Sequence, residues 1–292
     1  MSKTIVFFGT DSFSASALRA LIGAGYTIAA VVTKPDSKQG RGHQLTAPLV
    51  KDIAVEHGLV VWQPLKLSEI VDDIKALGPV TGVLSSYGKI VPQVIIDLFE
   101  IGIINVHPSL LPKYRGPSPI ETAITNGDSK TGVSIMQLTA AMDAGPVYAQ
   151  RPYDLNGTET QPGLYETLSN EGSNLLIEVL PQILDGTLRG MPQLDDDATY
   201  CHLLKKEDAL LDLSKITAVD AERSVRAHLL YPKSKLTAYG QSIIVLRAHV
   251  ADEPTDSLAQ QGVDGKYLVV DSLIGPSGKQ MSGEAFVNGY AN

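Results

Sequence analysis

The sequence contains a single cysteine, no long apolar run and no excess of positive charge. Because Cys201 has no second cysteine to pair with, an intramolecular disulfide is excluded, and we expect a reducing, cytoplasmic setting. No apolar stretch approaches the roughly 18–20 residues that span a bilayer. The opening apolar run reaches Gly9 too soon for the hydrophobic part of a signal peptide. We therefore expect neither membrane insertion nor export.

The net charge of −8 offers no general attraction for nucleic acid, so any nucleic-acid partner must be held by local basic patches. Hydrophobic residues make up 43% of the 292 residues, and aromatic residues only 6%. This composition is typical of a soluble globular α/β protein with one large domain or two ordinary ones.

Between residues 1 and 155, short β-rich apolar runs alternate with helix-like segments. Continuous apolar strands that alternate with helices predict a mainly parallel, Rossmann-like sheet covered on both faces. Ligands of such sheets bind beyond the carboxyl ends of the strands. The expected strands are 4–10, 27–33, 59–63, 81–86, 102–106 and 132–138, and the expected helices are 11–25, 47–58, 67–78 and 118–127.

The remainder of the chain changes character. A long helix is expected over 164–186, with a kink or restart at Pro181, and a shorter helix over 216–229. Period-two segments separated by Gly, Pro and Asp then predict a small β-barrel or sandwich, of which we expect an OB-like barrel; they are 235–239, 242–250 and 266–273. We therefore expect an α/β domain, a linker and a C-terminal β-barrel domain, over 1–188, 189–206 and 207–292.

The first strand is followed by a turn in which Gly9 is the only glycine. A dinucleotide site would carry the pattern G-x-G-x-x-G at this place, so a nicotinamide-dependent dehydrogenase is disfavoured. The beginning of the next helix, with Thr10, Asp11 and Ser12, could still contact a polar ligand.

The stretch "NVHPSLLPKYRGPSPI" (105–120) places Asn105 and His107 at the carboxyl end of an expected strand. Residues two apart on a strand share one face, so the two side chains can converge on one reacting atom. An amide and a protonated imidazole are donors suited to an oxyanion, and histidine also transfers protons near neutral pH. Asp143, after the strand 132–138, is the carboxylate that could orient the imidazole. These residues favour acyl transfer without a covalent intermediate, because no Ser or Cys has an evident neighbouring base.

A structural explanation competes with this one. An Asn-x-His at a strand end is most often a turn with satisfied side chains, and Asp143 beside Gly145 is usually an Asx turn. The loop prolines favour function, because a stiff segment suits a preorganised site; they are Pro108, Pro112, Pro117 and Pro119. The adjacent Cys201 and His202 lack further spaced ligands, so we expect no metal site.

The stretch 105–120, together with "MDAGP" (142–146), resembles the formyltransferases that use 10-formyltetrahydrofolate. Other segments resemble the methionyl-tRNA branch of that family, so the likeness covers nearly the whole chain. They are "TKPDSKQGRGHQLTAPLVKDIAVEHGLVVWQP" (33–64), "SYGKIVP" (86–92) and "GPSGKQMSGEAFVNG" (275–289). The resemblance departs at Pro108, where that branch usually has Gly or Ala, and in the first turn, which lacks a proline.

The resemblance implies that Asn105 and His107 polarise the formyl carbonyl, while Asp143 orients His107 and helps to remove the amine proton. The formyl donor would be 10-formyltetrahydrofolate and the acceptor the initiator methionyl-tRNA, which 207–292 would help to bind. Folate would contact Ser109, Leu110, Leu111, Pro112, Tyr87, Gly88, Ile90 and Val91. Lys38 and Arg41 would approach the end of the tRNA, although loop charges between glycines are usually only solvated.

Three alternatives stay open. A nucleotide-sugar N-formyltransferase shares the core residues but normally has another second domain. A 10-formyltetrahydrofolate hydrolase would use the same residues with water in place of the amine. A folate-binding module without activity is disfavoured because Asn105, His107 and Asp143 are all present. We expect a monomeric, cytoplasmic enzyme.

Overall fold

The computed structural model describes residues 4–39 and 44–291. The chain divides into two compact units. Unit 1 comprises Met1–Pro117, Thr131–Tyr153 and Tyr165–Tyr200; unit 2 comprises Ser118–Lys130, Asp154–Leu164 and Cys201–Asn292. Both units are thus assembled from separate stretches of chain. The domains expected from the sequence, 1–188 and 207–292 with a linker at 189–206, are continuous, and they remain a prediction.

Unit 1 is built on a seven-stranded sheet with the order β5-β2-β1-β6-β7-β8-β9. The pairs from β5 to β7 are parallel, and β8 runs antiparallel to β7, which confirms the mainly parallel, Rossmann-like sheet. The strands are β1 (Thr4–Phe8), β2 (Thr27–Val32), β5 (Val61–Trp62), β6 (Thr81–Ser85), β7 (Ile103–His107), β8 (Lys130–Gln137) and β9 (Val147–Asp154). The edge strand β9 was not predicted.

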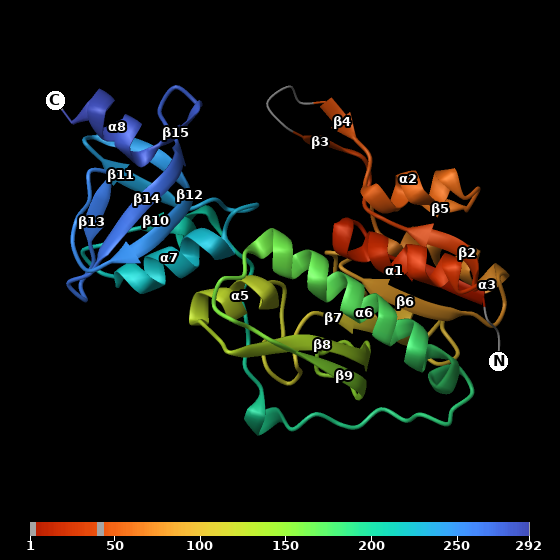
Figure 1. Ribbon diagram of the computed structural model, residues 1–292. Coiled ribbons are helices and arrows are strands. Elements are labelled where there is room, and N and C mark those ends of the chain that lie inside the picture. Colours follow the sequence, from red (N-terminus) through yellow and green to blue (C-terminus); the bar gives the residue numbers. More distant parts are fainter. Residues whose placement is uncertain (1–3, 40–43, 292) are drawn as a thin grey trace. The chain divides into compact units, whose positions relative to one another are not determined.

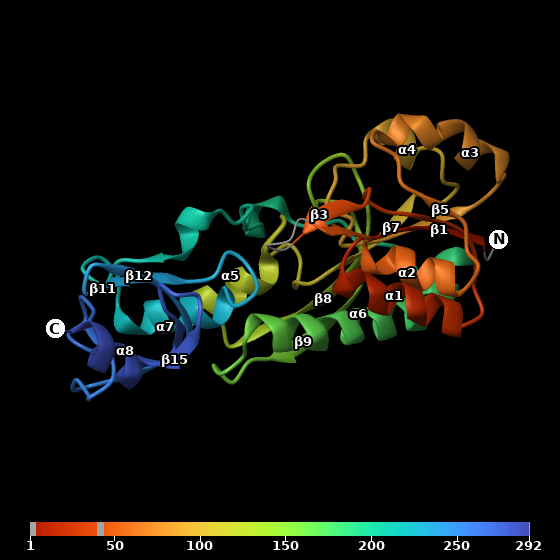
Figure 2. The same cartoon turned by 90° about the horizontal axis from the view of Figure 1, so that it is seen from above.

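Helices cover both faces of this sheet, as Figure 2 shows, with α3 and α4 on one side and α1 and α2 on the other. Asp11 caps α1, since its Oδ1 accepts hydrogen bonds from the backbone N–H groups of Phe13 and Ser14. The helix α6 is continuous through Pro181, so the predicted restart does not occur. The bounds are α1 (Ser12–Gly23), α2 (Leu49–Glu56), α3 (Val71–Ala76), α4 (Gln93–Ile96) and α6 (Gln161–Leu184), with a 3-10 turn at Leu67–Ile70.

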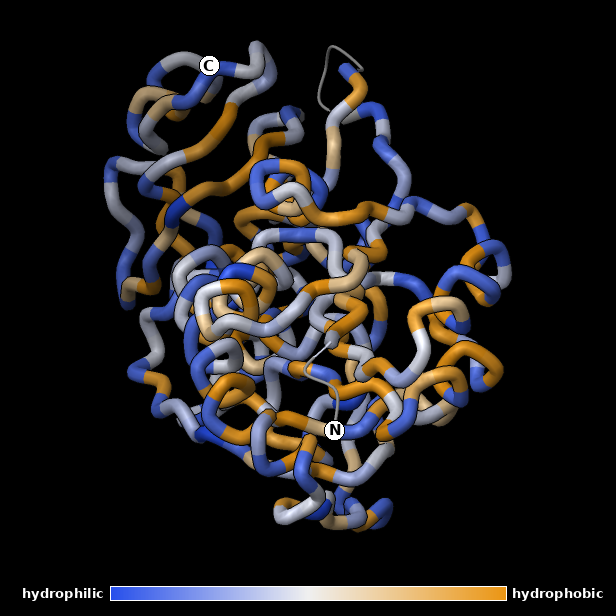
Figure 3. The backbone as a smooth tube through the Cα atoms, turned by 90° about the vertical axis from the view of Figure 1, so that its right-hand side faces the viewer, coloured by the Kyte–Doolittle hydropathy of each residue, from blue (hydrophilic) through white to orange (hydrophobic). Residues whose placement is uncertain are grey.

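The two faces of β7 have different neighbours. A Cβ added to Gly172 of α6 would lie 2.7 Å from the side chain of Val106, so α6 packs closely on the face to which Val106 points. Ile103 belongs to an apolar cluster on the opposite face, together with Phe8 and Tyr87, whose rings meet edge to face. Figure 3 shows hydrophobic and hydrophilic segments alternating along the chain. By the strand period, Asn105 and His107 lie on the face of Ile103.

Unit 2 contains a second, mostly antiparallel sheet with the order β10-β11-β12-β14-β13, in which β15 also pairs with β14 (Figure 1). It confirms a small β domain in the C-terminal part of the chain. The helix α5 belongs to this unit and packs against α7. The strands are β10 (Leu210–Leu211), β11 (Lys235–Ala238), β12 (Gln241–Ala251), β13 (Ala259–Gln261), β14 (Tyr267–Ile274) and β15 (Gln280–Ser282); the helices are α5 (Pro119–Asn126), α7 (Ala218–Ala227) and α8 (Gly283–Tyr290), with 3-10 turns at Asp195–Asp197 of unit 1 and at Lys206–Ala209.

Candidate active site

His107 is the last residue of β7, and the loop that follows it returns to contact its ring. The Nε2 atom lies 3.0 Å from the backbone oxygen of Tyr114. A carbonyl oxygen only accepts hydrogen bonds, so Nε2 must carry a proton and donate it. In the neutral ring Nδ1 is therefore the unprotonated nitrogen.

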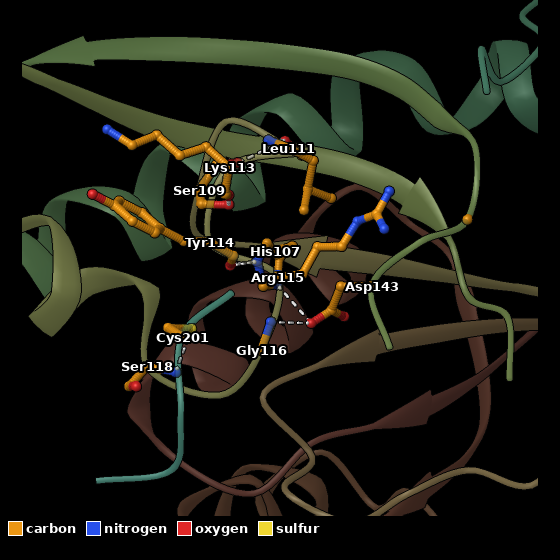
Figure 4. Close-up of polar contacts among 12 residues, drawn as sticks. His107, Ser109, Leu111, Lys113, Tyr114, Arg115, Gly116, Ser118, Asp143 and Cys201 are labelled. Atoms are coloured by element: carbon orange, nitrogen blue, oxygen red, sulfur yellow. Dashed lines mark hydrogen bonds and ion pairs between the residues drawn. The ribbon is translucent and has the colours of Figure 1, made fainter. Parts of the chain in front are cut away.

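Asp143 faces that second nitrogen from the loop after β8. Its Oδ2 lies 3.8 Å from His107 Nδ1 and accepts a 2.8 Å hydrogen bond from the backbone N–H of Gly116. Figure 4 shows His107, Gly116 and Asp143 converging, with the two contacts drawn as dashed lines. Because 3.8 Å exceeds hydrogen-bond length, no direct hydrogen bond joins this carboxylate oxygen to the ring. Asp143 itself has a left-handed backbone, with φ at 46°.

Asn105 shares the face of His107 and is a free donor. Its residue is 5% exposed, and its side chain makes no hydrogen bond to any residue that the structure describes. Asn105 is not among the residues with fully buried, unpartnered polar atoms, so its amide is accessible and can donate to a ligand. The structure thus brings together the three residues predicted as catalytic, with Asn105 and His107 from β7 and Asp143 from the loop after β8; their catalytic roles remain a prediction.

The proline-rich loop is held from β8 by one buried hydroxyl. Ser134 Oγ donates to the backbone oxygen of Ser109 at 2.6 Å and accepts from the N–H of Leu111 at 3.1 Å. Ser109 also donates through its own hydroxyl to the backbone oxygen of Lys113 at 2.6 Å. Ser109 and Leu111 are buried, while Leu110 and Pro112 are half-buried. The loop is therefore fixed by hydrogen bonds as well as by prolines.

The other residues predicted to contact folate differ widely in solvent exposure. Tyr87 is packed in the apolar core, where burial raises the pKa of its hydroxyl to about 12. Ile90, by contrast, is 87% exposed, and Val91 is buried. Gly88 has a left-handed backbone and lies beside Lys34. Their contact with folate stays a prediction.

A hollow of about 700 Å³ lies elsewhere in unit 1, between α4, the segment 99–102, the start of the Asp143 loop and 183–190. Tyr148 lines it, and burial raises the pKa of that hydroxyl. None of the residues predicted to contact folate lines this hollow. It borders the Asp143 loop through Leu138 and Thr139.

Two residues that the sequence did not single out support the site. Arg115 is 2% exposed and donates to Gln193, Asp195 and Tyr200. Burial lowers the pKa of its guanidinium, but the hydrogen bonds to Asp195 and Tyr200 outweigh that effect and leave the pKa raised. Gln193 donates to the backbone oxygens of Asp143 and Gly145. The one available signal was an arginine enclosed by glycine and prolines in "KYRGPSP".

Of the two residues predicted to contact tRNA, Lys38 lies on the short strand β3 (Ser37–Gln39), which pairs antiparallel with β4 (Gln44–Thr46). Lys38 is exposed and pairs with Leu45. Arg41 lies outside the described residues. Just before the hairpin, Asp36 is paired with Lys51 at 2.8 Å and accepts from Gln63, and these hydrogen bonds lower the pKa of its carboxyl.

The sequence was compared with the sequences and structures of known proteins. A profile described as formyl transferase matches residues 2–180. The chain belongs to the formyl transferase family.

Two curated relatives in the formyl transferase family match most of the chain. The methionyl-tRNA formyltransferase of Chloroflexus aggregans is 42% identical over 89% of this chain and 84% of its own length. That of Neisseria meningitidis serogroup C is 37% identical over 98% of this chain and 96% of its own length. The similarity therefore includes the stretches that form unit 2.

Solved structures share the fold. An N-formyltransferase from Helicobacter canadensis, in a complex with folinic acid and dTDP-3-aminofucose, superposes with a TM-score of 0.70 at 17% identity, over 92% of this chain and 99% of that one. HypX from Aquifex aeolicus, in complex with tetrahydrofolic acid, gives 0.69 at 15% identity, over 99% of this chain and 47% of that one. Among the described residues, no helix is long and apolar enough to cross a membrane, and no group of three or more His, Cys, Asp and Glu could hold a metal.

The hydrogen bond to Tyr114 predicts the tautomer of His107. In the neutral ring the proton should be on Nε2, because the Tyr114 carbonyl can only accept. Long-range ¹H–¹⁵N correlation spectra of the protein with ¹⁵N-labelled histidine measure this, and a His107→Gln variant identifies the His107 signals. A neutral ring protonated on Nδ1 would contradict the contact.

Proposed function

We propose that the protein transfers a formyl group from 10-formyltetrahydrofolate to the free amino group of initiator methionyl-tRNA. The observation that carries this proposal is the similarity to methionyl-tRNA formyltransferases, which at 37% identity extends over 98% of the chain. A similarity confined to the catalytic residues would be common to formyl transferases with other acceptors. Formylmethionyl-tRNA would serve translation initiation in the cytoplasm, and the enzyme would act as a monomer.

The reaction joins the amine nitrogen to the formyl carbon and breaks the bond from that carbon to N10 of the folate. The proton that leaves the amine ends on the released folate nitrogen. Asn105 donates to the formyl oxygen as negative charge develops there. His107 as imidazolium adds positive charge, and the Asp143 carboxylate faces its Nδ1 at 3.8 Å. Asp143 also helps to take the amine proton.

The Asn105 side chain and the loop beside it fit a folate-derived formyl donor. The amide of Asn105 makes no hydrogen bond to the described side chains and backbone groups, and a formyl oxygen is an acceptor. The stiff loop from Ser109 to Pro112 begins two residues after His107, so a ligand held against this loop is adjacent to the donors. These observations support 10-formyltetrahydrofolate as the donor and leave the contacts of its ring to Tyr87, Gly88, Ile90 and Val91 as an expectation.

A nucleotide-sugar acceptor is the second candidate, because the solved neighbour from Helicobacter canadensis was crystallised with dTDP-3-aminofucose. At 17% identity that neighbour supports the fold, and not the choice of acceptor. Water as the acceptor would make the protein a hydrolase. The acceptor therefore has to be measured.

Purified protein should be incubated with 10-formyltetrahydrofolate and, in separate reactions, methionyl-tRNA, a nucleotide-linked amino sugar or water alone. We expect formylated methionyl-tRNA, detected by mass spectrometry of the hydrolysed aminoacyl end, and little free formate. Formate release without formylation of an acceptor would overturn the proposal in favour of a hydrolase. Formylation of the sugar alone would overturn it in favour of the second candidate.

Asn105→Ala should lower kcat by about 10²–10³-fold, because it removes a donor aimed at the developing negative charge. Folate affinity, measured by calorimetry, should stay within about threefold of wild type. Asn170→Ala, which changes an exposed asparagine on α6, is the matched control and should keep full activity. If Asn105→Ala turned over at the wild-type rate, Asn105 would have no part in the reaction.

Lys38→Ala and Arg41→Ala should each weaken binding of methionyl-tRNA while folate binding stays intact. A lost phosphate contact should reduce the slope of log affinity against log salt by about one per residue. Lys75→Ala, an exposed lysine on α3, serves as the control for a simple change of charge. A defect in folate affinity alone would exclude the hairpin from tRNA binding.

A further inference from the structure

Gln193 lies in the stretch that sequence patterns assign to a linker, yet its side chain contacts the Asp143 loop. Its Nε2 donates to the backbone oxygens of Asp143 and Gly145, both at 2.7 Å. Its Oε1 accepts from Nε of Arg115 at 3.0 Å. All four residues belong to unit 1.

Both the nitrogen and the oxygen of the Gln193 carboxamide take part in these contacts. The amide nitrogen has two protons and donates both, and the amide oxygen receives the Arg115 donor. A glutamate of the same shape would present an acceptor to two carbonyl oxygens, and a leucine would remove the donor to both oxygens and the acceptor of the Arg115 Nε–H. The position therefore requires glutamine by its chemistry as well as by its length.

The backbone that Gln193 holds is under strain. Asp143 has a φ of 46°, which is unfavourable for a residue with a Cβ. At Gly145 an added Cβ would collide with the backbone oxygen of Gln137, so the loop folds tightly over the end of β8. A strained turn keeps its shape only where neighbouring contacts determine it, and Gln193 supplies two of them.

Arg115 connects the same glutamine to the loop that holds His107. Its backbone N–H donates to the oxygen of Thr199 at 2.9 Å, and its guanidinium donates to Tyr200 and Asp195 at 3.1 and 2.8 Å. The N–H of Tyr114, whose oxygen accepts from His107, donates to Thr199 Oγ1. The segment 193–200 thus contacts both loops that bring His107 and Asp143 together.

We propose that Gln193 is a positioning residue for formyl transfer, which fixes the Asp143 loop so that the carboxylate faces His107 Nδ1. The inference rests on the proposed function. Gln193 touches neither reacting group in this scheme and acts through Asp143. The segment 193–200 therefore supports the candidate active site, in addition to any role as a connection.

The experiment compares Gln193→Leu and Gln193→Glu with Gln182→Leu and Gln182→Glu, which make the same changes at an exposed position of α6. We expect both Gln193 variants to lose about 10–100-fold in kcat, since a displacement of about 1 Å at a reacting group has effects of that size. KM for either substrate should change less than about threefold. The melting temperature of each variant shows whether it is folded at the assay temperature, and Gln193→Glu, which keeps the side-chain shape, serves if Gln193→Leu is not.

A double-mutant cycle with Asp143→Asn separates positioning from general damage. If Gln193 acts through Asp143, Gln193→Leu should cause little further loss in the Asp143→Asn background, so the two effects should be strongly non-additive. Independent effects that multiply would overturn the proposal, as would wild-type kcat in both Gln193 variants.

A second readout needs no substrate and so distinguishes failure of this inference from failure of the proposed function. The amide proton of Gly116 donates to the Asp143 carboxylate, so its NMR chemical shift reports on that contact. It should move in Gln193→Leu and stay unchanged in Gln182→Leu. An unmoved Gly116 amide in a folded Gln193→Leu protein would overturn the positioning role, whatever acceptor the enzyme uses.

Discussion

The hydrogen bond from the Gly116 N–H to Asp143 joins two loops that leave neighbouring strands of the sheet. One loop begins at His107 and bends back so that Tyr114 accepts from its ring; the other begins after Gln137 and brings a carboxylate to the opposite ring nitrogen. Because β7 and β8 are antiparallel, the end of β7 lies beside Ser134, and the Asp143 loop leaves from the other end of β8. The Gly116 hydrogen bond therefore joins the Asp143 carboxylate to the loop that follows His107.

The side chains of His107 and Asn105 differ in how many protein contacts they make. Both nitrogens of His107 face protein oxygen atoms, whereas Asn105 keeps its donors for a ligand. In the proposed reaction, His107 would supply charge as imidazolium and Asn105 would supply a directed hydrogen bond. A site of this kind needs little rearrangement of its donors when charge develops, which is the physical meaning of preorganisation.

The sequence predicted the parts of this site that follow from local periodicity. Asn105 and His107 share a face because strand residues alternate, and the apolar runs of β1, β2, β6 and β7 made the parallel sheet recognisable. The edge strand β9 was missed because its residues are half-buried or exposed and include Arg151 and Pro152. Pro181 does not interrupt α6, although a proline inside a helix usually does.

Gln193 was beyond prediction for a different reason. It meets Arg115 across 78 positions of sequence, and no periodicity links residues so far apart. The ring contacts of His107 could not be predicted either, because only the folded loop shows that the backbone oxygen of Tyr114 accepts a hydrogen bond from Nε2.

The discontinuity of the two units has a consequence for how the protein could be divided. The chain passes from one unit to the other at 117/118, 130/131, 153/154, 164/165 and 200/201. A gene fragment that encodes 207–292 would therefore lack α5, on which α7 packs, and a fragment that ends at 188 would carry α5 without α7. Neither fragment corresponds to one complete compact unit. Recombination at the predicted linker, 189–206, would therefore expose apolar helix surface in both products.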